Sequence, residues 1–127
     1  MKLKMTTSKG EKYVDVYNLC PHHVTLVGKE DTTIIESHQQ IIPRRTTQEV
    51  MTDDSIAGVP IVKSGFGFLV NLPDKKPDTY YIVSLIVAQY ANRDDLLYCS
   101  QLIKDSGNHV IGCQKLSKFV KKIKGLQ

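Results

Sequence analysis

Short β-prone runs separated by turn residues constrain the fold of this chain more than any other feature. Residues 13–17, YVDVY, alternate apolar and polar side chains with the period of two that is typical of a half-buried strand. A turn that contains Pro21 follows, and β-branched residues then dominate VTLV at 24–27 and TTIIES at 32–37. The pattern predicts three antiparallel strands in a row.

The middle of the chain predicts further strands around proline and glycine. Pro43 must lie at the edge or end of a strand, because proline cannot donate to a ladder, and residues 44–50 are β-prone again. Two apolar runs within 56–72 flank Phe66, whose neighbouring glycines allow a positive φ or a close backbone approach. Phe66 is therefore expected to project outward. Aromatic and β-branched residues predict a strand at 80–83.

One short helix and one hairpin are predicted next. Ser84 is well placed as the N-cap of a helix over 85–91, and Asn92 tolerates the left-handed conformation that ends helices. Residues 97–103 and 109–114 bracket the loop sequence KDSGN, which predicts a hairpin.

A last helix is predicted at the C-terminus, where apolar residues recur with helical spacing and lysines occupy the opposite face. The elements together predict an α+β fold: a mostly antiparallel β-sheet with one short inserted helix and a C-terminal amphipathic helix. Residues 1–12 are expected to be a flexible lead-in, and residues 13–127 a single ligand-binding domain. The apolar positions of the last helix are Leu116, Phe119, Val120 and Ile123.

Composition and charge narrow the class of protein. The chain is 41% hydrophobic, but no apolar run approaches the roughly 18 residues that cross a bilayer, so no membrane partner is expected. The N-terminus lacks the apolar segment of a secretory signal. The net charge is +4, and five lysines follow residue 113 without any acid. Such a basic tail is more often a solvated face than a nucleic-acid site.

The cysteines indicate a reducing compartment. Three cysteines at wide spacing do not form a disulfide framework. The sequence CPHH places Cys20 beside His22 and His23, which suggests zinc, but no second Cys or His pair stands at ligand spacing. We therefore expect neither a metal site nor a cofactor.

The segment SLIVAQYANRDDLL, residues 84–97, runs from an apolar stretch directly into Asn92, Arg93, Asp94 and Asp95. Three interpretations compete: a catalytic acid pair, a capped turn without chemistry, and the polar rim of a ligand site. Adjacent carboxylates point in different directions, which argues against one shared acid–base centre. Capping explains Asn92 and one aspartate but not the arginine. A guanidinium grips phosphate in a bidentate fork, and carboxylates accept hydrogen bonds from ribose hydroxyls.

Other candidate ligand contacts are cationic or aromatic. Arg44 and Arg45 are either solvated residues that deter edge pairing or an anion site. Phe66, between two glycines, is the better stacking candidate. Tyr90 is better explained as the last core residue of its helix than as a stacking platform. Lys115 either begins the basic face or contacts phosphate. The chain contains neither a G-x-S-x-G elbow nor a phosphate-loop pattern.

Three segments, VYNLCPHHVTL, YYIVSLIVAQYANRDDLL and HVIGCQKL, resemble a family of small phage and bacterial proteins that includes the Thoeris anti-defence sponges. The resemblance spans roughly residues 13 to 116. The family more often has Thr at the position of Cys20, which favours a structural cysteine. It more often has Arg at the position of Gln114, which leaves Lys115 as a substitute phosphate contact.

The resemblance implies a function. Members bind, without cleaving, the cyclic ADP-ribose isomers made by Thoeris TIR enzymes, and some also hold cyclic oligonucleotides at separate sites. They form oligomers, up to hexamers, with pockets between subunits. The resemblance therefore implies a homo-oligomeric sponge in the host bacterial cytoplasm, and not an enzyme. The alternatives are a hydrolase of the same signal and a small nucleic-acid-binding module. The predicted ligand-binding residues are Arg44, Arg45, Phe66, Gln89, Tyr90, Asn92, Arg93, Asp94, Asp95 and Lys115, and no catalytic residue is predicted.

Overall fold

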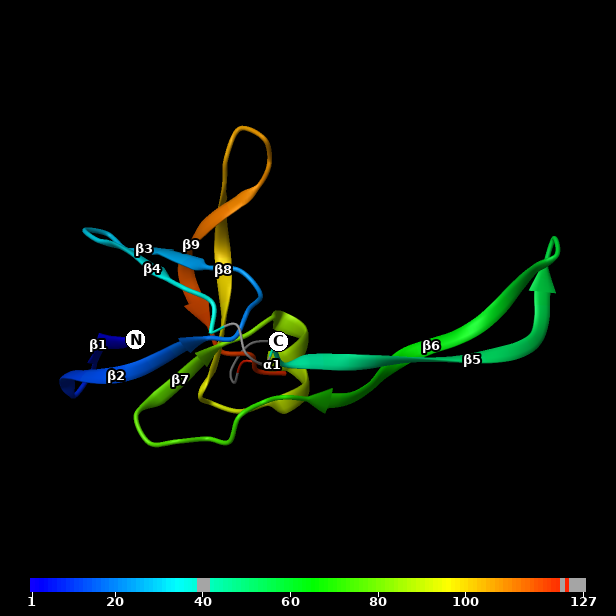
Figure 1. The fold of residues 1–127 in the computed structure, drawn as a ribbon, viewed down its shortest axis with the longest axis horizontal. Helices are drawn as coiled ribbons and strands as arrows, with labels where there is room; N and C mark the ends of the chain where they lie inside the picture. The colour runs from blue at the N-terminus through cyan, green and yellow to red at the C-terminus, as the bar shows by residue number, and fades with distance from the viewer. Residues whose placement is uncertain (39–41, 122, 124–127) are drawn as a thin grey trace.

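The computed structural model describes residues 1–38, 42–121 and 123, which form a β-rich fold with one short helix (Figure 1). This agrees with the predicted abundance of strands and with the inserted helix. The elements are β1 (Lys2–Thr7), β2 (Gly10–Asn18), β3 (Val24–Val27), β4 (Thr32–Ile35), β5 (Arg44–Ile56), β6 (Val59–Val70), β7 (Thr79–Ile82), α1 (Leu85–Ala91), β8 (Leu96–Lys104) and β9 (Val110–Ser117).

Seven strands form a mixed sheet in the order β1-β2-β7-β8-β9-β3-β4. The pairs β1–β2, β8–β9 and β3–β4 are antiparallel, but β2–β7, β7–β8 and β3–β9 are parallel. The prediction of three antiparallel strands in a row is therefore right only for β3 and β4. Alternation along a segment identifies a strand but not its partner, and β7 lies beside β2 because its mostly buried, apolar sequence suits the centre of a sheet.

The N-terminal residues form a hairpin where the sequence predicted a flexible lead-in. In β1 the side chains alternate between exposed and half-buried positions, and Leu3 and Met5 pack against the core. Thr7 lies opposite Gly10, whose φ of 120° suits the end of the turn between β1 and β2. Leu3 and Met5, two residues apart, point to the same face of the strand, and the ladder with β2 pairs the segment with the sheet.

The predicted C-terminal helix does not begin at Leu116. Leu116 lies opposite Cys99 in the β8–β9 ladder, and the hydroxyls of Ser117 and Ser100 are 2.7 Å apart. Residues 118–121 form no helix, although Phe119 packs against the core. The strand pairing therefore prevails over the helical spacing of the apolar residues. Residues 122 and 124–127 of the predicted helix lie outside the described residues.

Two apolar clusters form the core, on opposite faces of β7. Tyr81 and Val83 belong to one cluster and Ile82 to the other, because successive side chains of a strand point to opposite faces. The helix α1 packs on the first face through Val87 and Ala88. Among the described residues, no helix has the length and apolar character needed to cross a membrane.

The short helix has the predicted ends. The hydroxyl of Ser84 accepts a hydrogen bond from the backbone N–H of Val87 at 3.4 Å. Asn92 is left-handed, with φ 49° and ψ 46°, and its N–H donates to the carbonyl of Ala88. Both capping predictions are confirmed.

Strands β5 and β6, together called the arm, form a separate two-stranded sheet that extends away from the rest of the chain (Figure 1). At its tip, Ala57 and Gly58 both have positive φ, 52° and 80°. Positive φ at both central residues is the mark of a type I′ turn, whose twist matches antiparallel strands. The root of the arm contacts α1.

Candidate functional site

In the turn after α1, the guanidinium of Arg93 binds groups of its own chain. Arg93 donates from Nε to Oδ1 of Asp95 at 2.9 Å and from Nη2 to Oδ2 at 2.6 Å, and from Nη1 to the carbonyl of Pro73 at 2.8 Å. The Asp95 residue is only 3% exposed. This pair ties the turn to the loop before β7, with the bidentate geometry that an arginine would also use on phosphate.

Asp94 points elsewhere. It is exposed and pairs with Lys75, and the hydrogen bond from Lys75 holds the pKa of the Asp94 carboxyl below its ordinary value. The two adjacent carboxylates thus have different cation partners, and Asn92 serves as the helix cap. Of the four residues of this turn, only Asp94 and Asn92 face solvent substantially.

A cation between two aromatic rings lies at the root of the arm. The guanidinium carbon of Arg45 is 4.5 Å from the ring centroid of Phe66 and 4.7 Å from that of Tyr90. We call these three residues, from β5, β6 and α1, the cation–aromatic cluster. Phe66 is 52% exposed and Tyr90 45% exposed, so the cluster is open to a ligand. Within the described residues, Arg45 Nε is shielded from solvent and has no hydrogen-bond partner.

An irregularity in the arm sets the position of this cluster. The β5–β6 register shifts between Arg45 and Thr47, and the Thr46 hydroxyl bridges to Phe68, accepting from its N–H at 2.8 Å and donating to its carbonyl at 3.2 Å. A Cβ at Gly67 would lie 2.5 Å from the Thr46 hydroxyl oxygen. Of the two possibilities that the sequence allows at the glycines beside Phe66, a close approach is present at Gly67 and allows the bridge, whereas a Cβ at Gly65 would meet nothing within 4 Å and neither glycine has a positive φ.

The remaining predicted residues are spread over other surfaces. Arg44 begins β5 opposite Val70, Gln89 is exposed on α1, and Lys115 is exposed on β9 opposite Ser100. The structure thus brings Arg45, Phe66 and Tyr90 into direct contact, while it engages Arg93 and Asp95 with each other. Whether any of these residues binds a ligand stays a prediction.

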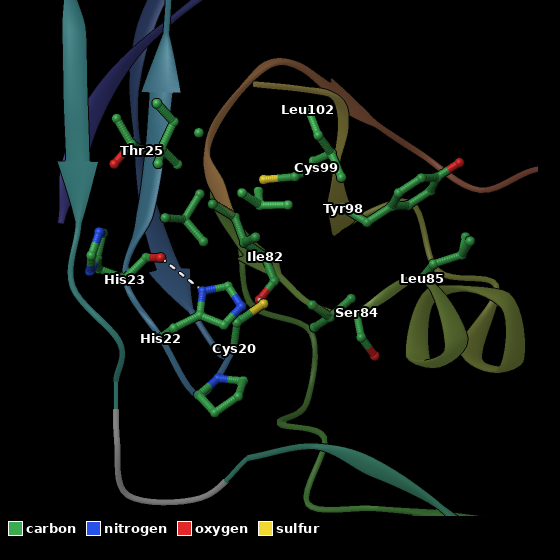
Figure 2. Close-up of a pocket in the computed structure, with 16 residues that line it drawn as sticks. Cys20, His22, His23, Thr25, Ile82, Ser84, Leu85, Tyr98, Cys99 and Leu102 are labelled. Carbon is green, nitrogen blue, oxygen red and sulfur yellow. Dashed lines mark hydrogen bonds between the residues drawn. The ribbon is translucent and has the colours of Figure 1, made fainter. Parts of the chain in front are cut away.

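A groove that the sequence did not indicate lies between β3 and the β8–β9 hairpin (Figure 2). Its volume is about 660 Å³, within the range of small-molecule sites. The walls are largely apolar and include Ile82, Leu102 and Ile111. Four separate segments supply the walls, so no local pattern could reveal the groove. The CPHH sequence, which suggests zinc by residue type, supplies part of its lining.

His22 and the cysteines determine the polarity of this groove. His22 Nδ1 lies 2.8 Å from the carbonyl of His23, which can only accept, so Nδ1 carries the proton and a neutral ring keeps Nε2 as an acceptor. Burial raises the pKa of the Cys20 thiol. Burial and a hydrogen bond with Cys113 raise the pKa of Cys99 to about 12. The thiols therefore remain neutral and contribute apolar surface rather than nucleophiles.

The described part of the chain contains no group of three or more His, Cys, Asp or Glu side chains that could hold a metal ion. Comparison of the chain with models of protein families, with curated proteins and with solved structures finds no match. The family suggested by the sequence segments therefore stays a prediction.

Proposed function

We propose that this protein binds a cyclic nucleotide immune signal and sequesters it without cleaving it, as a phage anti-defence sponge in the host bacterial cytoplasm. The ligand class is a cyclic ADP-ribose isomer, with cyclic oligonucleotides as a second class. The observation that carries the proposal is the cation–aromatic cluster, in which two half-exposed aromatic residues flank one guanidinium.

The chemistry of such a ligand suits this cluster. Any of the bases can stack on an exposed aromatic ring, because every base has a π-face. Such stacking contributes about 1–3 kcal/mol per base. The pyrophosphate needs a cation, and the Arg45 guanidinium lies between the two rings. Phe66 and Tyr90 therefore supply the base contact and Arg45 the phosphate contact.

Sequestration also requires tight binding. Retention of a micromolar signal needs a binding free energy of about −8 kcal/mol or better. The cluster of one chain leaves about half of each ring exposed, which is too open to bury a dinucleotide. A second copy that covers the cluster would close the site, so the proposed sponge is a homo-oligomer, up to a hexamer.

The test is recovery of intact ligand. The protein is incubated with each cyclic ADP-ribose isomer, separated from free ligand, heat-denatured and its supernatant analysed by mass spectrometry. Intact ligand at a fixed ratio to protein supports storage. A linear product would instead establish a hydrolase, and protein that retains no cyclic nucleotide would refute the proposal. Phe66→Ala is the matched variant, because it removes one ring and leaves the charges unchanged.

A further inference from the structure

The arm exposes apolar side chains along its whole length. A two-stranded hairpin is at best marginally stable on its own, and the arm has no third strand beside it in the described structure. Unpaired edges and exposed apolar side chains on one element are typical of a surface that another chain covers. The exposed apolar residues of the arm are Val50, Met51, Ile56, Val59, Ile61, Phe66 and Phe68.

Charge indicates what covers the arm. The distal arm, residues 48–64, carries Glu49, Asp53 and Asp54 but only Lys63, a net charge of −2. Because the whole chain is +4, the rest of the chain is +6. Two distal arms repel each other, whereas a distal arm is attracted to the body of another copy.

The body offers a concave surface of matching character. The groove between β3 and the β8–β9 hairpin is largely apolar and has two histidines on its β3 side (Figure 2). Three of its lining residues, Leu102, Val110 and Ile111, are each about half exposed. An extended apolar ribbon and an apolar groove on one chain are complementary surfaces for two copies.

We infer that the distal arm of one copy lies in the β3/β8–β9 groove of a second copy. This inference rests on the homo-oligomer of the proposed function but not on its ligand. A protein that binds no nucleotide would therefore leave the docking of the arm intact. A monomeric protein that binds nucleotide would refute the docking of the arm and leave nucleotide binding intact.

The experiment uses three double variants of the full chain. Ile56→Ser/Val59→Ser alters the distal arm, and Leu102→Ser/Ile111→Ser alters the groove. Tyr13→Ser/Ile34→Ser is the matched control, because both residues are more than half exposed and belong to neither surface. Mass is measured by size-exclusion chromatography with light scattering, and circular dichroism establishes that each variant is folded.

We expect the wild type and the control to be oligomers, with masses of at least twice the 14.3 kDa of one chain. The other two variants are expected to be monomers. A mixture of the arm variant and the groove variant should form a two-chain species, because one intact arm and one intact groove remain. A monomeric wild type, a groove variant with the wild-type mass, or a mixture that stays monomeric would each overturn the inference.

A charge variant tests the same contact without removing apolar groups. Asp53 and Asp54 are exposed near the tip of the arm, so Asp53→Lys/Asp54→Lys should fold normally. We expect its dissociation constant for self-association to rise at least tenfold at low salt, and the difference from wild type to shrink as salt screens the charges. Equal dissociation constants at low salt would contradict docking on the basic body.

Discussion

Arg93 and Asp95, two residues apart, are joined by two parallel hydrogen bonds that close a turn around a buried carboxylate. The same fork would serve a phosphate in a ligand site. Here it is already occupied by the chain, and a third bond holds the carbonyl of Pro73. The hydrogen bonds of Arg93 therefore stabilise the folded turn, and any role of the turn in binding depends on that folded structure.

Removal of Arg93 should destabilise the protein strongly. In Arg93→Ala the Asp95 carboxylate stays buried without its partner, and the free energy of unfolding should fall by about 3 kcal/mol. Denaturant unfolding measures the change. Asp94→Asn is the control, because that carboxylate is exposed and its loss should leave stability unchanged. If Arg93→Ala loses ligand while its stability holds, the turn is a ligand rim instead.

The contribution of Asn92 to stability should depend on its positive φ and not on its side chain. Asn92 is left-handed, a conformation in which a Cβ without a polar group is unfavourable. Asn92→Ala should therefore cost about 1 kcal/mol of unfolding free energy, and Asn92→Gly should change it by a few tenths. Thermal unfolding of the two variants side by side distinguishes them. Equal losses would mean that the side chain, and not φ, is what matters.

The helix caps and the hairpin loop could be predicted from the sequence, because interactions between residues close in the sequence determine them. Ser84 and Asn92 cap α1 through groups within four residues, and KDSGN closes the β8–β9 hairpin through the Asp105 side chain and the N–H of His109. The partners of β2 were not readable, because Thr79–Ile82 lies some sixty residues away and pairs in parallel. The antiparallel pairing of β9 with β8 overrode the helical spacing at Leu116 and Ser117, which lie opposite Cys99 and Tyr98.

The candidate site divides in the same way. The sequence singled out Arg45, Phe66 and Tyr90 by residue type, but only the arm and α1 bring them together. It could not predict that Arg93 turns to Asp95, because the chemistry that suits a ligand also suits an internal ion pair. The groove was not predicted, since its walls come from four segments that lie far apart in the sequence.

Gly67 should matter to the arm and Gly65 should not. A methyl group at Gly67 would collide with the Thr46 hydroxyl, break its bridge to Phe68 and move Phe66 from Arg45. Gly67→Ala should lower stability by about 1 kcal/mol and weaken nucleotide binding.

At Gly65 a Cβ meets nothing within 4 Å, so Gly65→Ala should keep both properties at or above wild type. Thermal unfolding and calorimetric titration of the pair check the prediction. Equal effects at both glycines would show that Thr46 does not set the cluster.

The cation–aromatic cluster should carry the nucleotide. Phe66→Ala should weaken binding by about 1–3 kcal/mol, roughly 5- to 150-fold, through lost stacking, and Arg45→Ala should weaken it further through lost charge. Phe68→Ala is the matched control, because Phe68 is an exposed ring on the same strand that bridges to Thr46 only through its backbone. Isothermal titration calorimetry gives the three affinities, and equal loss in Phe66→Ala and Phe68→Ala would exclude a specific stacking site.

The thiol of Cys99 should make stability fall at alkaline pH. Burial raises its pKa from the ordinary 9.0 to about 12 in the folded protein. Because the folded state disfavours the thiolate, the stabilising contribution is complete below pH 9.0 and is lost progressively as the pH rises towards about 12. The denaturation midpoint should therefore decline over this window more steeply in wild type than in Cys99→Ala, whatever the difference between their midpoints at neutral pH. Parallel declines in the two proteins would mean that Cys99 ionises as freely in the folded chain as in the unfolded one, and that water reaches the base of the groove.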